Sequence, residues 1–102
     1  MIDKLMTDIH AWSSATFPHQ TASSKVAHLL EEVNELRDAI KNGHTSDAIE
    51  EWADCMILLL NTGVMIGLDA ESAVKAIEVK MNINKARKWG KPDKDGVCRH
   101  LK

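Results

Sequence analysis

The sequence predicts an all-α protein, with residues 1–102 forming one domain built as a four-helix bundle with a short C-terminal tail. Apolar residues recur at spacings of three and four along most of the chain, which is the pattern of amphipathic helices. The two prolines, Pro18 and Pro92, lie near the ends, so no proline interrupts the middle. A chain of 102 residues that is 44% hydrophobic suits one ordinary domain with short helix connections.

The first two helices are identified by their apolar stripes and by their ends. The first covers residues 2–17 and stops before Pro18. The second follows the candidate N-caps Thr21, Ser23 and Ser24, and it ends at Gly43, the residue type that most often closes a helix. The stripes consist of Ile2, Leu5, Met6, Ile9 and Trp12 in the first helix and of Val26, Leu29, Leu30, Val33, Leu36 and Ile40 in the second.

The third helix is the most apolar part of the chain. It starts near Thr45–Asp47, where Asp47 and Glu50 have the spacing of a capping box, and it runs to Gly67. Residues 52–66 are apolar nearly all round, so this helix is expected at the buried centre of the fold or of a dimer. Such an apolar surplus in so small a domain predicts self-association. A fourth helix is expected from Asp69, its N-cap, to about Trp89.

Composition excludes several classes of protein. A net charge of −2 gives no basic field, so we expect neither a nucleic-acid nor an anionic-membrane partner. The longest apolar run, Cys55–Leu60, is far shorter than the ~20 residues of a membrane span. The N-terminal residues do not have the pattern of a signal peptide. The two distant cysteines do not form a metal-binding pair, and a cytoplasmic protein is expected.

Two pairs of acids carry the first chemical signal. Glu32 and Glu35 lie one turn apart on the second helix, and Glu51 and Asp54 have the same spacing on the third. If the helices pack side by side, four carboxylates converge, which protons or cations must neutralise. Oxygen ligands favour Mg²⁺, with Mn²⁺ as a substitute, over zinc. A di-iron bundle would need Glu-x-x-His pairs, which are absent here. The alternative is a solvated helix surface.

Asp54 and Asn61 argue against that alternative. Asp54 precedes an apolar run, so we expect it to be buried with a charged or hydrogen-bonding partner. Asn61 lies two turns further along the same face and is a candidate substrate-binding residue. Trp12 and Trp52 could stack on a base, but their spacing among apolar residues favours a place in the core. His28, one turn before Glu32, is assigned no role.

The fourth helix carries a basic row formed by Lys80, Asn84 and Arg87, at offsets of four and seven. Two cations and an amide on one face suit an anion with several oxygens, such as a triphosphate. The alternative is a basic helix end that complements the helix dipole.

Taken in order, the motifs resemble those of the all-α nucleotide pyrophosphatases, the MazG and dimeric dUTPase group. The resemblance spans residues 24–89, and its parts are Glu31-Glu32-x-x-Glu35, Glu51-x-x-Asp54 and Lys80-x-x-x-Asn84-x-x-Arg87. It implies that Glu32, Glu35, Glu51 and Asp54 hold magnesium and that Lys80, Asn84 and Arg87 hold phosphate. Glu31 and Glu35 are then the expected catalytic residues, with Glu31 orienting water or substrate. The ending Arg87-Lys88-Trp89-Gly90 with Asp95-Gly96-Val97 is similar to small phage members of the dATP/dGTP diphosphohydrolase kind.

The resemblance implies a magnesium-dependent enzyme that splits a nucleoside triphosphate into a monophosphate and pyrophosphate. It also implies a homodimer or homotetramer. Two alternatives remain open at this point: a non-catalytic helical adaptor whose acids solvate a dimer surface, and a hydrolase of another diphosphate-containing metabolite. The sequence does not indicate which base is preferred.

Overall fold

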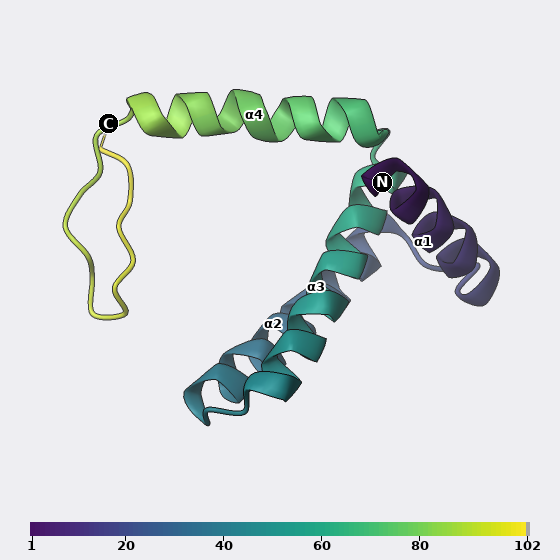
Figure 1. The fold of residues 1–102 in the computed structure, drawn as a ribbon, viewed down its shortest axis with the longest axis horizontal. Coiled ribbons are helices and arrows are strands. Elements are labelled where there is room, and N and C mark those ends of the chain that lie inside the picture. The colour runs from purple at the N-terminus through teal and green to yellow at the C-terminus, as the bar shows by residue number, and fades with distance from the viewer. Residues whose placement is uncertain (102) are drawn as a thin grey trace. The chain divides into compact units, whose positions relative to one another are not determined.

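The computed structural model describes residues 1–101 and contains four helices: α1 (Ile2–Thr16), α2 (Ala22–Lys41), α3 (Thr45–Met65) and α4 (Ala70–Ala86) (Figure 1). The described residues include no β-strand, only an isolated bridge between Trp89 and His100. The all-α prediction is therefore confirmed. The chain divides into two compact units, Met1–Glu71 and the segment from Ser72 onward. Each unit is described by itself, and one domain with α4 packed in a bundle stays a prediction.

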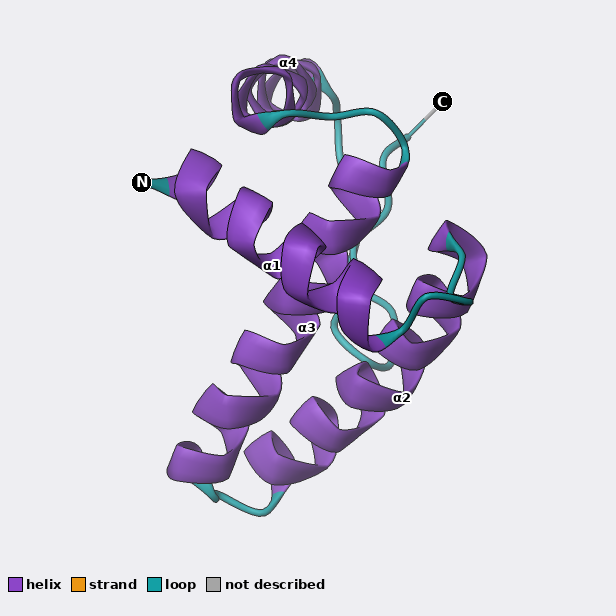
Figure 2. Ribbon diagram, turned by 90° about the vertical axis from the view of Figure 1, so that its right-hand side faces the viewer, coloured by secondary structure: helices purple, strands orange, loops and turns teal. Residues whose placement is uncertain are grey.

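In the first unit, α2 and α3 form an antiparallel pair and α1 crosses α3 (Figure 2). Gly43 makes the tight connection between α2 and α3 possible, because its φ of 69° is easily adopted only by glycine. The Gly43 and His44 amides donate to the carbonyls of Ile40 and Ala39 at 3.1 and 3.0 Å. The connection is short, so the acidic segments of α2 and α3 are brought side by side.

One of the predicted helix ends is confirmed by the structure, and two are wrong. Thr21 caps α2 in a reciprocal pair of hydrogen bonds with Ser24. The expected capping box of Asp47 and Glu50 is wrong, because α3 begins at Thr45 after the N-cap His44. Asp47 instead lies in the first turn, where its charge complements the helix dipole. The expected end of α4 near Trp89 is also wrong, since the helix ends at Ala86.

A hairpin-like segment follows α4. The Gly90 amide donates to the Arg99 carbonyl, and the Leu101 amide donates to the Lys88 carbonyl, each at 2.8 Å. At the tip, Asp93 accepts hydrogen bonds from the Asp95 and Val97 amides and forms an ion pair with Arg99 at 2.8 Å. Its pKa is lowered, first by the Arg99 guanidinium and then by these amides.

The core of the described chain is small. Its buried apolar residues are Met6, Ile9, Ala39, Cys55, Leu58 and Ala73. The expectation that α3 is buried nearly all round is wrong for the single chain: Trp52, Leu59 and Ile66 are 58%, 51% and 67% exposed. The cause is that α1 and α2 cover only the side of α3 that carries Cys55, Leu58 and Asn61. Trp12, expected in the core, is 57% exposed.

Among the described residues, no single helix is long and apolar enough to cross a membrane. The consecutive helices α3 and α4 meet that criterion of length and composition only as an interrupted pair.

Candidate metal centre and adjoining cavity

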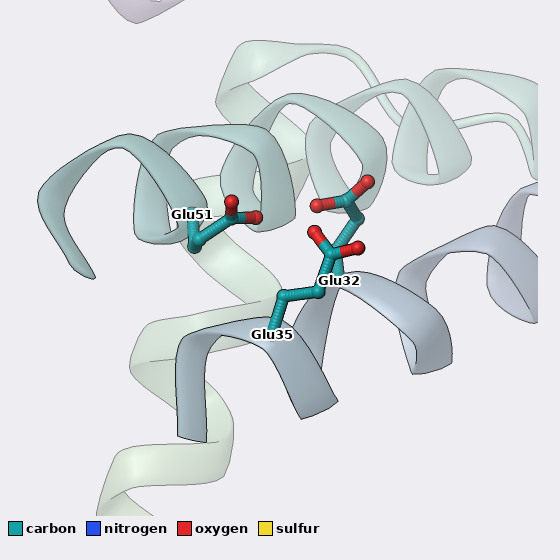
Figure 3. Close-up of side chains that lie close together, drawn as sticks. All are labelled: Glu32, Glu35 and Glu51. Atoms are coloured by element: carbon teal, nitrogen blue, oxygen red, sulfur yellow. The ribbon is translucent and has the colours of Figure 1, made fainter. Parts of the chain in front are cut away.

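Three of the four predicted carboxylate ligands meet between α2 and α3. Glu32 and Glu35 project from α2 toward Glu51 on α3 (Figure 3), and one oxygen from each lies within 4.8 Å of the other two. The i, i+3 spacing places both α2 carboxylates on one side of the helix. The antiparallel partner then supplies Glu51 from the other side. Helix packing alone therefore produces a cluster of three like charges.

Like-charge proximity changes the protonation of this cluster. Hydrogen bonding to the Glu32 carboxyl and then to that of Glu35 raises the pKa of Glu51 to about 7. The hydrogen bond with Glu51 lowers the pKa of Glu32. Burial and the nearby Glu35 carboxylate raise this pKa by more, so the pKa of Glu32 is also raised. Without a cation, the cluster therefore retains a proton at pH values where isolated carboxylates are ionised.

The oxygens of the cluster are also incompletely bonded. The Oε2 atoms of Glu32 and Glu51 are buried without a hydrogen-bond partner, while Glu32 Oε1 lies 3.1 Å from His28 Nε2. Buried carboxylate oxygens normally have a partner, and a hard divalent cation bound by oxygens would supply one. The three residues present therefore fit a divalent metal ion.

The fourth predicted ligand, Asp54, lies outside this set of three. Its side chain is exposed in the described chain, so the expectation that it is buried is wrong. The physical reason is that Asp54 lies at the wall of a cavity, beside Leu58 and Asn61, and not in the packed core. Asp54 still lies near enough to Glu32 for its charge to raise the Glu32 pKa. Its role as a ligand stays a prediction.

Glu31 and Asn61 differ from each other in their surroundings. Glu31 is exposed on α2 and is not among the three clustered carboxylates, and its catalytic role stays a prediction. Asn61 is 2% exposed, and its amide is already bonded within the protein. Nδ2 donates to Ser13 Oγ at 3.1 Å, and Oδ1 lies 3.1 Å from His10 Nδ1. Asn61 thus joins α3 to α1, and its predicted contact with substrate stays a prediction.

The predicted phosphate-binding row belongs to the second unit. Lys80 is exposed on α4, whereas Asn84 and Arg87 are half-buried near its C-terminal end. Arg87 Nη1 lies 3.5 Å from both Asn84 Oδ1 and His100 Nδ1. Arg87 is thus supported by the hairpin-like segment. Binding of phosphate by these three residues stays a prediction.

A cavity of about 190 Å³ adjoins the carboxylates in the first unit. Its lining residues include Glu32, Asp54 and His28. Two aromatic side chains also line it, those of Trp12 on α1 and of Phe17, the C-cap of that helix. The two rings meet edge to face with centroids 5.5 Å apart. The remaining lining residues are Ile9, Ser13, Lys25, Ile57, Leu58 and Asn61. The cavity is thus mainly apolar, with a few polar groups at defined positions.

Two polar residues of this cavity, Ser13 and Lys25, were not identified from the sequence. Both are 3% exposed, and Lys25 Nζ donates a hydrogen bond to Ser13 Oγ. Burial lowers the pKa of Lys25, and its Nζ lies 4.8 Å from the centre of the Phe17 ring. The sequence could have predicted the burial of Ser13, because this residue lies four positions after Ile9 and seven after Met6, on the buried stripe of α1.

Comparison with known proteins identifies the family of the chain. Residues 5–102 match the model of the dATP/dGTP pyrophosphohydrolase family. A dATP/dGTP diphosphohydrolase of Cyanophage S-2L is 34% identical over 100 residues, covering 98% of this chain and 88% of that protein. A dATP/dGTP diphosphohydrolase of Salmonella phage PMBT28 is 36% identical over 93 residues, covering 91% of this chain but 29% of that protein.

A solved structure extends the likeness to three dimensions. The Cyanophage S-2L MazG-like pyrophosphohydrolase, bound to dGDP and three catalytic Mn²⁺ ions per active site, matches with a TM-score of 0.79 and 30% identity. The match covers 100% of this chain and 98% of that one. Fold and site thus define a MazG-like, all-α pyrophosphohydrolase. Within that class, the chain belongs to the dATP/dGTP pyrophosphohydrolase family.

The raised pKa of Glu51 predicts how the stability of the metal-free protein depends on pH. In the folded protein the Glu51 carboxyl keeps its proton up to about pH 7, whereas the usual pKa of a glutamate is 4.5. The folded state therefore binds more protons than the unfolded state between these values, and the free energy of unfolding falls as pH rises through this window. Thermal unfolding in EDTA, followed by circular dichroism from pH 4.5 to 8, measures this dependence.

Glu51→Gln is the matched variant, because it keeps the shape and removes the titration. Its melting temperature should fall less between pH 4.5 and 7 than that of the wild type. If the variant and the wild type follow parallel curves, the carboxylates are not coupled as the structure indicates.

Proposed function

We propose that the protein hydrolyses dATP and dGTP to the nucleoside monophosphate and pyrophosphate, with Mg²⁺ as the cation and Mn²⁺ as a substitute. The observation that carries the proposal is the convergence of Glu32, Glu35 and Glu51, two of which have a buried oxygen without a partner. The names of the two phage relatives support the purine deoxynucleotides as substrates. The Mn²⁺ ions and dGDP in the related S-2L structure support a divalent cation and a nucleotide as ligands of this protein.

A divalent cation at this site would neutralise phosphate oxygens and lower the pKa of a water molecule. In the proposal, Glu32, Glu51 and Asp54 hold the cation together with Glu35. Glu35 is the exposed member of the cluster, so water reaches it, and we assign to it and to Glu31 the orientation of the attacking water. Lys80, Asn84 and Arg87 bind the phosphates, and Asn61 supports the substrate from the cavity wall.

The proposal is tested by incubating the protein with dATP and dGTP in Mg²⁺ and separating the products by ion-exchange chromatography. The expected products are dAMP or dGMP and an equal amount of pyrophosphate. Asp54→Asn should lower turnover by at least roughly 100-fold, because it removes a ligand of the cation that stabilises the negative charge of the transition state. Asp8→Asn, an exposed acid on α1, is the matched control and should retain wild-type turnover. Absence of nucleotide cleavage with either Mg²⁺ or Mn²⁺ would refute the activity.

A second prediction separates phosphate binding from a helix-dipole role for the basic row. The dipole effect fades within the last turn of a helix, whereas Lys80 lies six residues before the end of α4 at Ala86. If Lys80 binds phosphate, Lys80→Met should lower kcat/KM by roughly two to three decades, the usual effect of losing one charge-assisted contact in the transition state. Lys75→Met, an exposed lysine of the same helix, serves as control. Wild-type kinetics in both variants would exclude Lys80 from the site.

We also infer that the protein is a homodimer or homotetramer. Three exposed apolar side chains of α3, Trp52, Leu59 and Ile66, follow one another at offsets of seven along one face of the helix. A symmetric partner would cover this face. Sedimentation at micromolar concentration should give a mass at least twice 11.4 kDa. A single folded species at 11.4 kDa would contradict the inference.

A further inference from the structure

We propose that the Ser13 hydroxyl is a fixed hydrogen-bond donor that reads N7 of the substrate's purine base. This inference rests on the proposed function, and it assigns the cavity beside the carboxylates to the base. It also explains how one site accepts adenine and guanine together. The argument depends on the hydrogen bonds that Ser13 already makes.

Both acceptor positions of Ser13 are in use. A serine hydroxyl has two lone pairs and one proton. Lys25 Nζ donates to Oγ, and Asn61 Nδ2 donates to it at 3.1 Å. His10 Nδ1 lies 3.1 Å from Asn61 Oδ1, and its donation to that oxygen keeps Nδ2 directed at Ser13. Ser13 is therefore left with a proton to donate and no lone pair for a further donor.

That proton makes no hydrogen bond to a described residue. The hydroxyls of Thr7 and Thr62 donate to the carbonyls of Asp3 and Leu58, four residues earlier, at 2.9 and 2.8 Å. Ser13 makes no such bond within residues 1–101, and it is 3% exposed. A buried donor without a partner costs free energy, so an acceptor that enters the adjoining cavity would gain a hydrogen bond.

The cavity suits the flat base of a nucleotide. Its volume of about 190 Å³ is below the roughly 300 Å³ of a pocket for a whole drug-sized ligand, so it fits a part of the substrate. Trp12, Phe17 and Ile57 give it apolar walls, and aromatic side chains stack favourably on any base. Glu32 and Asp54 line the same cavity. A base inside it would therefore leave the phosphates near the proposed metal site.

A fixed donor selects among base atoms. Position 6 carries an amino donor in adenine and a carbonyl acceptor in guanine, so a group that can only donate cannot bond to both. N7 is an acceptor in both purines, and pyrimidines have no imidazole ring to supply it. A donor to N7 therefore accepts dATP and dGTP alike and rejects pyrimidine nucleotides.

The test measures binding rather than turnover, so that it is independent of the proposed activity. Isothermal titration in Mn²⁺ compares dGDP with 7-deaza-dGDP, in which a C–H group replaces N7. The wild type should bind dGDP roughly tenfold to hundredfold more tightly, the usual effect of leaving a buried donor unpaired. In Ser13→Ala the two ligands should bind equally. Ser14→Ala, the exposed neighbour on α1, should retain the wild-type ratio.

Equal affinities of the wild type for dGDP and 7-deaza-dGDP would overturn the proposal, whatever the folding of Ser13→Ala. An unchanged ratio in folded Ser13→Ala would overturn it as well. A wild-type preference for dGDP that Ser13→Ala removes supports the proposal even if no nucleotide is cleaved, in which case the proposed activity alone fails. Cleavage of dATP and dGTP without discrimination against the 7-deaza analogues would leave the activity and remove the role of Ser13.

Discussion

Repulsion among the carboxylates of Glu32, Glu35 and Glu51 is the constraint that gives the first unit its chemical character. The short connection at Gly43 forces α2 and α3 to pack side by side, and this packing brings the three charges within 4.8 Å of one another. Repulsion at that range is relieved by a proton or by a cation. The raised pKa of Glu51 is the response of the metal-free protein. Helix packing, protonation and metal binding are therefore linked at one place.

A buried polar network holds α1 against this pair of helices. Ser13, Lys25 and Asn61 come from three different helices, and their hydrogen bonds meet at the Ser13 oxygen. Polar groups buried in this way restrict a fold to one arrangement because alternatives leave them unpaired. The same arrangement positions the aromatic side chains Trp12 and Phe17 at the cavity. The network thus connects the stability of α1 with the shape of the proposed base site.

Local signals predicted much of this structure, and tertiary packing decided the rest. The three- and four-residue spacing of apolar side chains, with helix-ending residues such as Gly43, predicted four helices. The spacing of the acidic residues predicted the cluster of Glu32, Glu35 and Glu51. The exposure of Asp54 could not be predicted, because periodicity shows that a helix is apolar but not where a cavity remains between packed helices. The link between Ser13 and Lys25 depends on the crossing of α1 over α3, and no local pattern contains that contact.

The central claim is that Glu32, Glu35 and Glu51 form a divalent cation site, and direct Mn²⁺ binding tests it most closely. Electron paramagnetic resonance of free Mn²⁺ gives the affinity without nucleotide or turnover. The wild type should bind Mn²⁺, and Glu51→Gln should weaken the affinity by at least roughly tenfold, as expected for loss of a group that tunes a metal site. Asp8→Asn should bind as the wild type does. Equal Mn²⁺ affinities in the wild type and Glu51→Gln would contradict the account.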